Sequence, residues 1–256
     1  MPFFRLRYIL IFIGLLAFCI IWTAPAWLMT RLVSTASNGN FEIENPVGSF
    51  WKGNATALNY INNKKTLQRF EKLSWEIVAT QLFKGTIAFR IIITDHQLTA
   101  DGIISAGLTG RSISDLQASL PADFVGNFIR DVKVLSPHGN LEIKAPLLSL
   151  DPIQIKQPVN ILWKNAGLSI SQVSPLGDYS VDLIPQKDSI GFNLQTIKGP
   201  LTVKGQGSYS DKFGGTFNGQ ARANDDARLA SLLKLMGPIQ KSGNVNISFT
   251  FASLQK

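Results

Sequence analysis

The sequence contains few side chains that could carry out catalysis. Its two histidines, His96 and His138, are each flanked by residues typical of turns, where a solvated histidine is far more common than a catalytic one. Its single cysteine, Cys19, lies inside an apolar run, and no Gly-x-Ser-x-Gly motif supplies an activated serine. No cluster of residues has the composition of a metal site. We therefore expect no enzyme activity, no cofactor and no bound metal.

Two further motifs have both a chemical and a structural interpretation. Asp225 and Asp226 could form a carboxylate pair, but they directly precede a helical pattern, where aspartate is preferred as an N-cap. The run Gly205-Gln206-Gly207 resembles the start of a dinucleotide-binding loop, but the third glycine and the following helix are missing. We expect these glycines to form a bulge or a twist within a strand.

The tryptophans could stack on a carbohydrate ring or a nucleic-acid base. Trp51, Trp75 and Trp163 occur in segments where apolar and polar residues alternate. Aromatic side chains in such strands are more often core residues, because they contribute much of the buried area. We therefore expect these three side chains to pack in the core.

An uncharged segment near the amino terminus, residues 8–28, is the strongest single feature of the sequence. A membrane-spanning helix needs about 20 apolar residues, and this segment can supply them. Arg5 and Arg7 precede it and no acidic residue does, so the positive-inside rule predicts a cytoplasmic tail at residues 1–7. We expect a transmembrane anchor at residues 8–28, with the rest of the chain outside the cytoplasm.

The same segment could instead be a cleaved signal peptide. Residues 24–26, Ala-Pro-Ala, fit the small-x-small cleavage pattern, which would leave a mature chain beginning at Trp27. The length of the apolar run favours the uncleaved anchor, as do Trp22 and Trp27, which are placed like interfacial aromatic residues. Cleavage after Ala26 stays open as the alternative.

The remaining chain has the composition of an exported globular body. The net charge of +8 falls to +6 once Arg5 and Arg7 are set aside, and the remaining positive charges are dispersed. Dispersed charge favours solubility and weak attraction to lipid headgroups, whereas nucleic-acid binding needs a dense basic stripe. We expect inner-membrane lipid, and no nucleic acid, as a partner.

Cysteine usage agrees with a bacterial periplasmic location. Because Cys19 lies in the predicted anchor, the body has no disulfide and depends on an apolar core for stability. We divide this body into a connector at residues 29–40 and a β-rich domain at residues 41–256, which is long enough for one core or two smaller ones.

Apolar and polar residues alternate at period two over most of residues 41–256, which predicts strands with one buried face. The connections are short and rich in Gly, Pro, Asn and Asp, as between antiparallel neighbours. We therefore predict a mainly β fold with a large antiparallel sheet, arranged as a meander, a sandwich or an open barrel. The alternating apolar residues include Leu73, Trp75 and Ile77; Leu141, Ile143 and Ala145; Tyr179, Val181 and Leu183; and Val245, Ile247 and Phe249.

Two short helices are expected between strands. Residues 121–129 begin with a proline, which the first helical turn accepts, although Gly126 weakens the pattern. The second helix begins after residues 224–226 and ends at Gly237-Pro238, with Leu229, Leu232, Leu233 and Met236 as its apolar stripe. We expect this stripe to close one end of the core of the sheet.

Several of these segments together resemble the type II secretion system protein N family. The resemblance begins at the end of the predicted anchor, residues 24–28, and includes residues 46–55, Pro-Val-Gly-Ser-Phe-Trp-Lys-Gly-Asn-Ala. It continues through residues 73–75, 82–85, 163–169, 175–179 and 232–237. It implies an inner-membrane accessory of the apparatus that exports folded proteins, without enzyme activity. The implied partners are other secretion components, either inner-membrane platform proteins or the secretin. The signature positions, which we expect to be structural, are Gly48, Trp51, Gly53, Ala55, Trp75, Trp163, Gly177 and Gly237.

The sequence is also distantly similar to the AsmA and TamB group. That resemblance implies a curved sheet with an apolar groove, so handling of lipid or another hydrophobic ligand is the alternative function. Sequence patterns leave open whether the inward apolar side chains contact one another or enclose such a groove. We expect no other small-molecule ligand.

Overall fold

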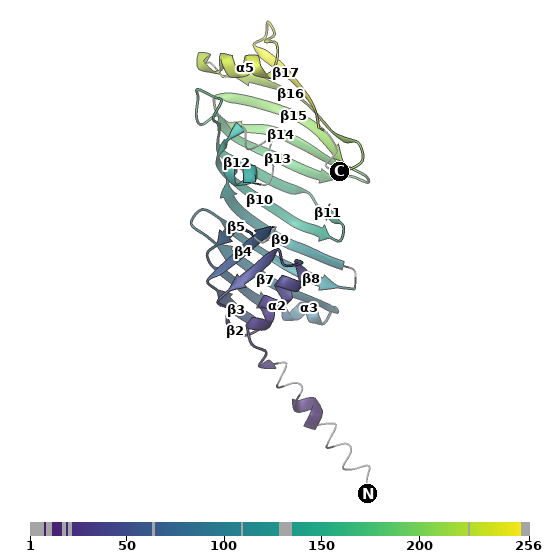
Figure 1. The fold of residues 1–256 in the computed structure, drawn as a ribbon. Helices are drawn as coiled ribbons and strands as arrows, with labels where there is room; N and C mark the ends of the chain where they lie inside the picture. The colour runs from purple at the N-terminus through teal and green to yellow at the C-terminus, as the bar shows by residue number, and fades with distance from the viewer. Residues whose placement is uncertain are drawn as a thin grey trace. The chain divides into compact units, whose positions relative to one another are not determined.

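The computed structural model describes residues 8, 12–16, 19, 22–62, 65–108, 110–127, 135–224 and 226–251. The fold is mainly β with a large antiparallel sheet and a few short helices, as predicted (Figure 1). The chain divides into two compact units. Unit 1 comprises Met1–Phe83 and Ile87–His96, and unit 2 comprises Lys84–Thr86 and Gln97–Lys256.

Unit 1 contains two small groups of antiparallel strands. Strands β1, β4 and β5 form a three-stranded sheet in the order β1-β4-β5, and the remaining strands pair in the order β7-β6-β3-β2. The elements are α2 (Trp27–Ala36), β1 (Phe41–Glu44), β2 (Val47–Gly48), β3 (Lys52–Ala55), β4 (Ala57–Asn62), β5 (Lys65–Phe70), β6 (Leu73–Ile77), α3 (Ala79–Leu82) and β7 (Thr86–Thr94).

The core of unit 1 includes residues from the end of the predicted anchor. Trp75 is 2% exposed and Met29 is 3% exposed, and both belong to one buried cluster together with Ala26. The backbone N–H of Phe50 donates to the carbonyl oxygen of Ala24 at 2.8 Å. The helix α2 runs to Ala36, so the predicted polar connector at residues 29–40 is largely helical and is fastened to the body.

The structure describes only part of the predicted anchor at residues 8–28, namely 8, 12–16, 19 and 22–28. Within the described parts of the chain, no helix is both long and apolar enough to span a bilayer. The predicted cytoplasmic tail at residues 1–7 lies outside the described residues.

Unit 2 is a meander in which each strand pairs antiparallel with its neighbour. The order is β8-β9-β10-β12-β13-β14-β15-β16-β17, and the short β11 pairs with the end of β10. The elements are β8 (Thr99–Gly107), β9 (Gly110–Pro121), η1 (Ala122–Asn127), β10 (Pro137–Leu150), β11 (Ile153–Ile155), β12 (Val159–Leu168), β13 (Gly177–Pro185), β14 (Ile190–Lys198), β15 (Leu201–Ser210), β16 (Gly214–Ala223), η2 (Ala227–Leu229), α5 (Ala230–Met236) and β17 (Asn244–Phe251).

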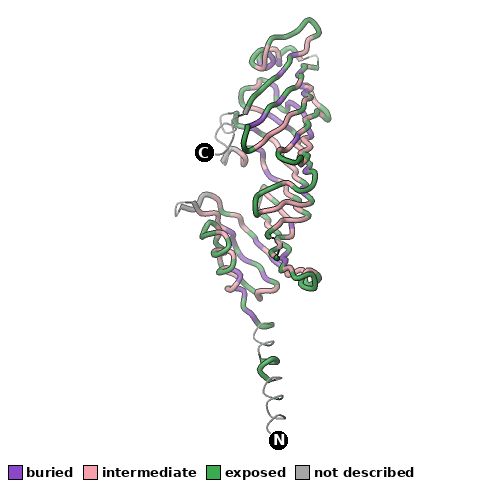
Figure 2. Tube along the Cα trace, turned by 90° about the vertical axis from the view of Figure 1, so that its right-hand side faces the viewer, coloured by how far each residue is buried: buried purple, intermediate pink, exposed green. Residues whose placement is uncertain are grey.

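The alternation predicted from the sequence is present in these strands. Burial changes from one residue to the next along much of unit 2, as the colours of Figure 2 show. In β17, for example, Val245 and Ile247 are buried whereas Asn246 and Ser248 are exposed. Period-two patterning therefore predicted the mainly β character of unit 2 and the buried face at the start of β17.

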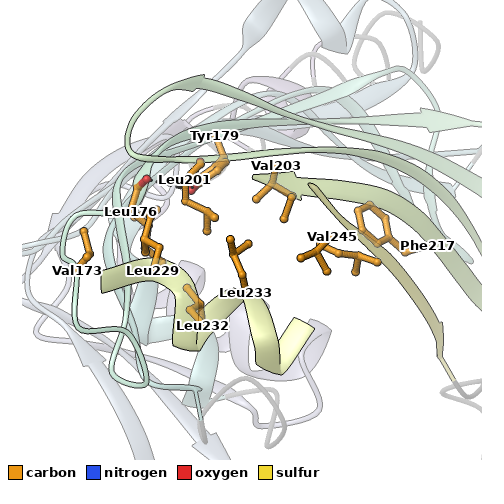
Figure 3. Packing of buried hydrophobic residues seen from close by; sticks show 13 residues of the cluster. Val173, Leu176, Tyr179, Leu201, Val203, Phe217, Leu229, Leu232, Leu233 and Val245 are labelled. Atoms are coloured by element: carbon orange, nitrogen blue, oxygen red, sulfur yellow. Dashed lines mark hydrogen bonds between the residues drawn. The ribbon is translucent and has the colours of Figure 1, made fainter. Parts of the chain in front are cut away.

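The helix predicted after residues 224–226 is confirmed. Leu229, Leu232 and Leu233 are buried, and α5 packs on β16 and β17 (Figure 3). These leucines contact side chains of the sheet in one apolar cluster, which includes Leu201 and Val203. The other predicted helix, at residues 121–129, is shorter: its described part is the 3₁₀ helix η1, and Pro121 ends the strand β9. Residues 128 and 129 lie outside the described residues.

Candidate functional site

The first group of signature residues forms a cradle for one indole ring. The Trp75 ring covers Gly53, where a β-carbon would overlap the ring and approach the Val47 carbonyl oxygen to 2.7 Å. The indole N–H donates to the carbonyl oxygens of Phe50 at 3.1 Å and Ser49 at 3.2 Å. Burial of the ring therefore leaves its one polar atom satisfied.

Two neighbouring signature positions complete the cradle. Gly48 has a φ of +103°, and a β-carbon there would lie 2.7 Å from the Lys52 carbonyl oxygen. Ala55 is 7% exposed and pairs with Leu73 across β3 and β6. A side chain at Gly48 would displace the backbone, and Ala55 lies in the buried cluster of unit 1.

Trp51 is less buried than Trp75. Its ring is half-buried and packs edge-on against Phe50 at a centroid distance of 5.1 Å. Its carbonyl oxygen accepts from the N–H of Ile77 at 2.7 Å. It lies in the bend before β3, and its contact Phe50 packs against the buried cluster of unit 1.

The other signature residues lie in unit 2 and also serve packing. Trp163 is half-buried, and its indole N–H donates to the His138 carbonyl oxygen at 2.8 Å. Gly177 has a φ of +151°, and its backbone lies against Lys198 and Gly199 with no room for a β-carbon. Gly237 follows α5 with a φ of +155°, and its N–H donates to the Leu233 carbonyl oxygen at 3.1 Å.

A buried tyrosine fixes the neighbouring loop to the sheet. The Tyr179 hydroxyl is 2.9 Å from the Leu201 carbonyl oxygen and 3.2 Å from the Leu176 carbonyl oxygen. Burial, and then the adjacent Asp178 carboxylate, raises the pKa of the Tyr179 phenol above its ordinary value. The phenol is therefore held as a neutral donor, which suits a structural role.

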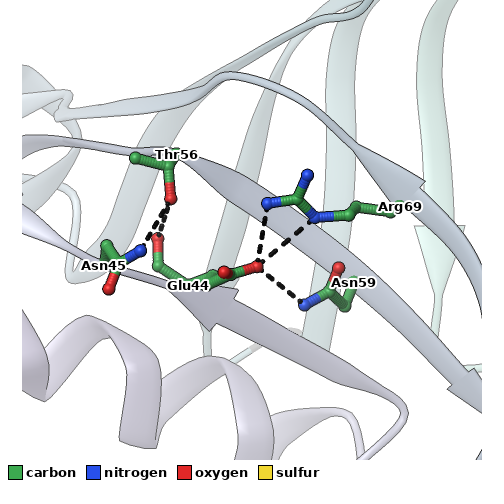
Figure 4. A network of polar contacts seen from close by, with 5 residues as sticks. All are labelled: Glu44, Asn45, Thr56, Asn59 and Arg69. Carbon is green, nitrogen blue, oxygen red and sulfur yellow. Dashed lines mark hydrogen bonds and ion pairs between the residues drawn. The ribbon is translucent and has the colours of Figure 1, made fainter.

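A polar network in unit 1 could not be identified from the sequence. The Glu44 carboxylate accepts from Arg69 Nη2 at 3.1 Å and from Asn59 Nδ2 at 3.5 Å, and the Glu44 carbonyl oxygen accepts from Thr56 (Figure 4). Asn45 Nδ2 donates to the Thr56 hydroxyl at 3.2 Å. Glu44 and Arg69 are 25 positions apart in the sequence, and the pairing of β1, β4 and β5 brings them together. The network links three strands. Because the side chains of Arg69 and Glu44 are both substantially exposed, their ion pair stabilises the fold only modestly.

One histidine, in β10, lies beside a serine that directly follows β12. His138 Nε2 lies 3.2 Å from the Ser169 hydroxyl, an arrangement that the sequence analysis missed. A base beside a hydroxyl is one element of nucleophilic catalysis, and a third group normally orients the base. Within the described residues, no carboxylate bonds to the other ring nitrogen of His138. The other histidine, His96, lies 3.3 Å from the Glu71 carboxylate at an exposed turn.

Asp226, one of the two aspartates before the second helix, behaves as a cap. The Asp226 carboxylate accepts from the backbone N–H of Arg228 at 3.0 Å, as expected for an N-cap. Its hydrogen bonds with the Arg228 guanidinium lower the pKa of the Asp226 carboxyl. Asp225 lies outside the described residues. Over the described chain, no group of three or more His, Cys, Asp or Glu residues could hold a metal ion.

The glycines of the run 205–207 do not form the predicted bulge. The pairing of β15 with β14 and with β16 shows no shift of register there. Instead, a β-carbon at Gly207 would overlap the Phe192 ring, and one at Gly205 would overlap the Phe217 ring. The glycines thus make room for aromatic rings from neighbouring strands, an effect that depends on tertiary pairing.

Among the described residues, the signature positions make the packing and backbone contacts given above. His96, His138 and Asp226 contact Glu71, Ser169 and Arg228, and the glycines of the run 205–207 lie against Phe192 and Phe217. A family model described as "Type II secretion system (T2SS), protein N" matches residues 39–248. The chain belongs to the type II secretion system protein N family. No curated protein and no solved structure gives a significant match.

Membership of this protein N family makes the chain a component of a type II secretion system. The match includes the Trp75 cradle of unit 1 and the strands of unit 2 as far as Ser248. It also associates the chain with the other components of that system and with the cell envelope.

Proposed function

We propose that this chain is a non-catalytic accessory of the type II secretion system, which holds other components in place at the inner membrane. The family match over residues 39–248 carries this proposal, because it covers parts of both units. The packing roles of the signature residues agree with a scaffold, since none of their side chains is reserved for a reaction.

In this proposal, residues 8–28 anchor the chain with residues 1–7 in the cytoplasm and residues 41–256 in the periplasm. The attachment of residues 24–29 to unit 1 supports an uncleaved segment. A chain that begins at Trp27 would lose the buried Ala24 and Ala26 and the hydrogen bond from Phe50. Intact mass measurement on protein from the membrane fraction should give the uncleaved chain, and a mature terminus at Trp27 would contradict the anchor.

Photo-crosslinking in intact cells tests the scaffold role. A photoreactive amino acid at Leu108 or Phe213, which are 104% and 89% exposed, should give adducts with inner-membrane platform proteins or the secretin. The same amino acid at the buried Trp75 serves as the control and should give none. The absence of any secretion component among adducts from the exposed positions would contradict the proposal.

A second candidate function, the handling of lipid or another hydrophobic ligand, is favoured by one observation. A row of apolar residues crosses strands β9 to β14 in register, and each of its side chains is only half-buried. The row consists of Ala118, Ile143, Ile161, Val181 and Leu194. Such a surface could hold an acyl chain, since burial of apolar area is favourable.

Mass spectrometry of lipids that remain bound to the purified full-length chain distinguishes the two functions. A ligand on this row should be lost in Leu194→Lys and retained in Gln195→Lys, because Gln195 is the exposed neighbour on the same strand. Equal lipid content in both variants and in the wild type would favour the scaffold alone.

A further inference from the structure

The strand β17 ends the sheet of unit 2 and leaves one edge open. On one side it pairs with β16 along its whole length, from Asn244 to Phe251. On its other side, the described contacts involve only the start of the strand: Ile239 bridges to Val245, and the N–H of Gln240 donates to the Asn244 carbonyl oxygen at 2.8 Å. Figure 1 shows β17, in yellow, next to β16 and α5.

The direction of the free backbone groups follows from that hydrogen bond. In an antiparallel strand, both backbone groups of a residue face the same neighbour, and successive residues alternate between neighbours. Because the Asn244 carbonyl faces away from β16, the backbone groups of Asn246, Ser248 and Thr250 do so as well. Gly237 lies beside the Asn246 carbonyl, so Ser248 and Thr250 provide the accessible part of the edge.

A row of aromatic rings leads to this edge and stops there. Phe192 and Phe217 stack at a centroid distance of 5.9 Å and an angle of 7°, and Phe217 and Phe249 stack at 6.1 Å and 16°. The cross-strand register aligns them, with Gly207 of β15 between the first two rings. Phe217 is 6% exposed, whereas Phe249, the last ring, is 49% exposed.

The sequence of β17 lacks the features that usually protect an edge strand. Edge strands are commonly short, charged or interrupted by proline. The edge strands β2 and β11 have two and three residues, and β5 contains Lys65 and Arg69. In contrast, β17 has eight residues, Asn-Val-Asn-Ile-Ser-Phe-Thr-Phe, with no charge and no proline.

We propose that β17 pairs with β17 of a second copy of this chain, antiparallel and centred on Phe249. In this register, Ser248 of each copy lies opposite Thr250 of the other, and these are the residues whose backbone groups face outward. The two copies would form hydrogen bonds through them and bring the two Phe249 side chains into direct contact. This inference does not depend on the role in secretion.

Three observations select a second copy as the partner. A two-fold axis requires a self-complementary surface, and the pairing of residue 248 with residue 250 about residue 249 satisfies this condition. The strand carries no charge, so two copies meet without like-charge repulsion along the edge. The second Phe249 would continue the aromatic row, and pairs of this kind contribute beyond their buried area.

Disulfide trapping of the full-length chain in membranes tests this register. In a Cys19→Ser background, Phe249→Cys should form a dimer under a copper–phenanthroline oxidant, because Cα atoms of such an opposed pair are about 4.5 Å apart and suit a disulfide. Asn246→Cys is the matched control: its two copies would be six residue positions apart in this register, about 20 Å, and should not crosslink.

A second variant separates specific pairing from random collision. Thr250→Pro removes an outward N–H that the proposed dimer uses and that pairing with β16 does not need, so the fold should be retained. It should weaken dimerisation of the otherwise wild-type chain by about tenfold in analytical ultracentrifugation. Crosslinking of Phe249→Cys no stronger than that of Asn246→Cys, a wild-type monomer, or a dimer unaffected by Thr250→Pro would each overturn the proposal.

Discussion

The Trp75 ring lies over the α-carbon of Gly53, and the two residues are paired across β6 and β3. A methyl group at Gly53 would overlap the ring and would also lie 2.7 Å from the Val47 carbonyl oxygen. We expect Gly53→Ala to lower the free energy of unfolding by about 1–3 kcal/mol, because the ring and the adjacent strand must move. Urea unfolding followed by tryptophan fluorescence measures the change.

The exposed neighbour Asn54 provides a control for this substitution. Asn54→Ala should change stability by less than about 0.5 kcal/mol, as for most surface sites. In a Trp75→Leu background, Gly53→Ala should cost less than in the wild type, since the smaller side chain relieves the overlap. Equal costs in both backgrounds would contradict the assigned contact.

Trp75 and Trp51 should respond differently to truncation. Trp75→Ala removes a side chain that is 2% exposed and should cost about 3–5 kcal/mol. Trp51→Ala removes a half-buried ring and should cost clearly less. Thermal unfolding of the two variants gives the comparison. An equal loss of stability in the two variants would mean that Trp51 is more closely packed than its exposure indicates.

The helix α5 provides a matched pair of leucines. Leu233 is 4% exposed within the core of unit 2, whereas Leu235 is 74% exposed. Leu233→Asp should destabilise unit 2 by several kcal/mol, because a carboxylate would be buried without a partner. Leu235→Asp, with the same change of side chain on the same helix, should have little effect on the melting temperature. Similar melting temperatures for the two variants would contradict the proposed packing of α5.

The ion pair between Asp151 and Arg111 predicts a pH dependence. The Asp151 carboxylate accepts from Arg111 Nε at 2.7 Å and from its backbone N–H at 3.1 Å, and these contacts lower the pKa of Asp151. Since the pKa is lower in the folded state, the contribution to stability is present above the unfolded pKa of about 4 and is lost as pH falls below it.

Urea unfolding of the wild type and of Asp151→Asn across that pH range measures this contribution. The difference in stability should be constant near neutral pH and disappear in acid. Arg111→Gln should show the same pH-dependent difference in stability from the wild type. Combining the two substitutions should add no further pH dependence. A difference that persists unchanged in acid would contradict the assignment.

The sequence predicted the elements of the fold better than the contacts between them. The strand around Tyr179 and the helix around Leu233 follow from local periodicity, and both are present. The contact of His138 with Ser169 and the placement of the Phe192 ring against Gly207 depend on which strands pair and in which register. Local patterns carry little information about register, so these contacts could not be predicted.

In the candidate site, too, the sequence predicted the segments but not the contacts between them. The resemblance at residues 46–55 identified the segment that forms the Trp75 cradle, but the donation of the indole N–H to Ser49 and Phe50 required the folded chain. Likewise, the eight residues of β17 were predicted as one strand among several. Its position at the edge and the half-exposed ring of Phe249 are properties of the assembled sheet.

The close packing of Ala26 and Met29 in unit 1 has a mechanical consequence. A load applied to the amino-terminal segment would be transmitted directly to the core around Trp75, because no slack linker separates the two. If that segment is embedded in a bilayer, unit 1 cannot swivel freely above it. The tilt of the segment would then set the orientation in which unit 1 meets its neighbours.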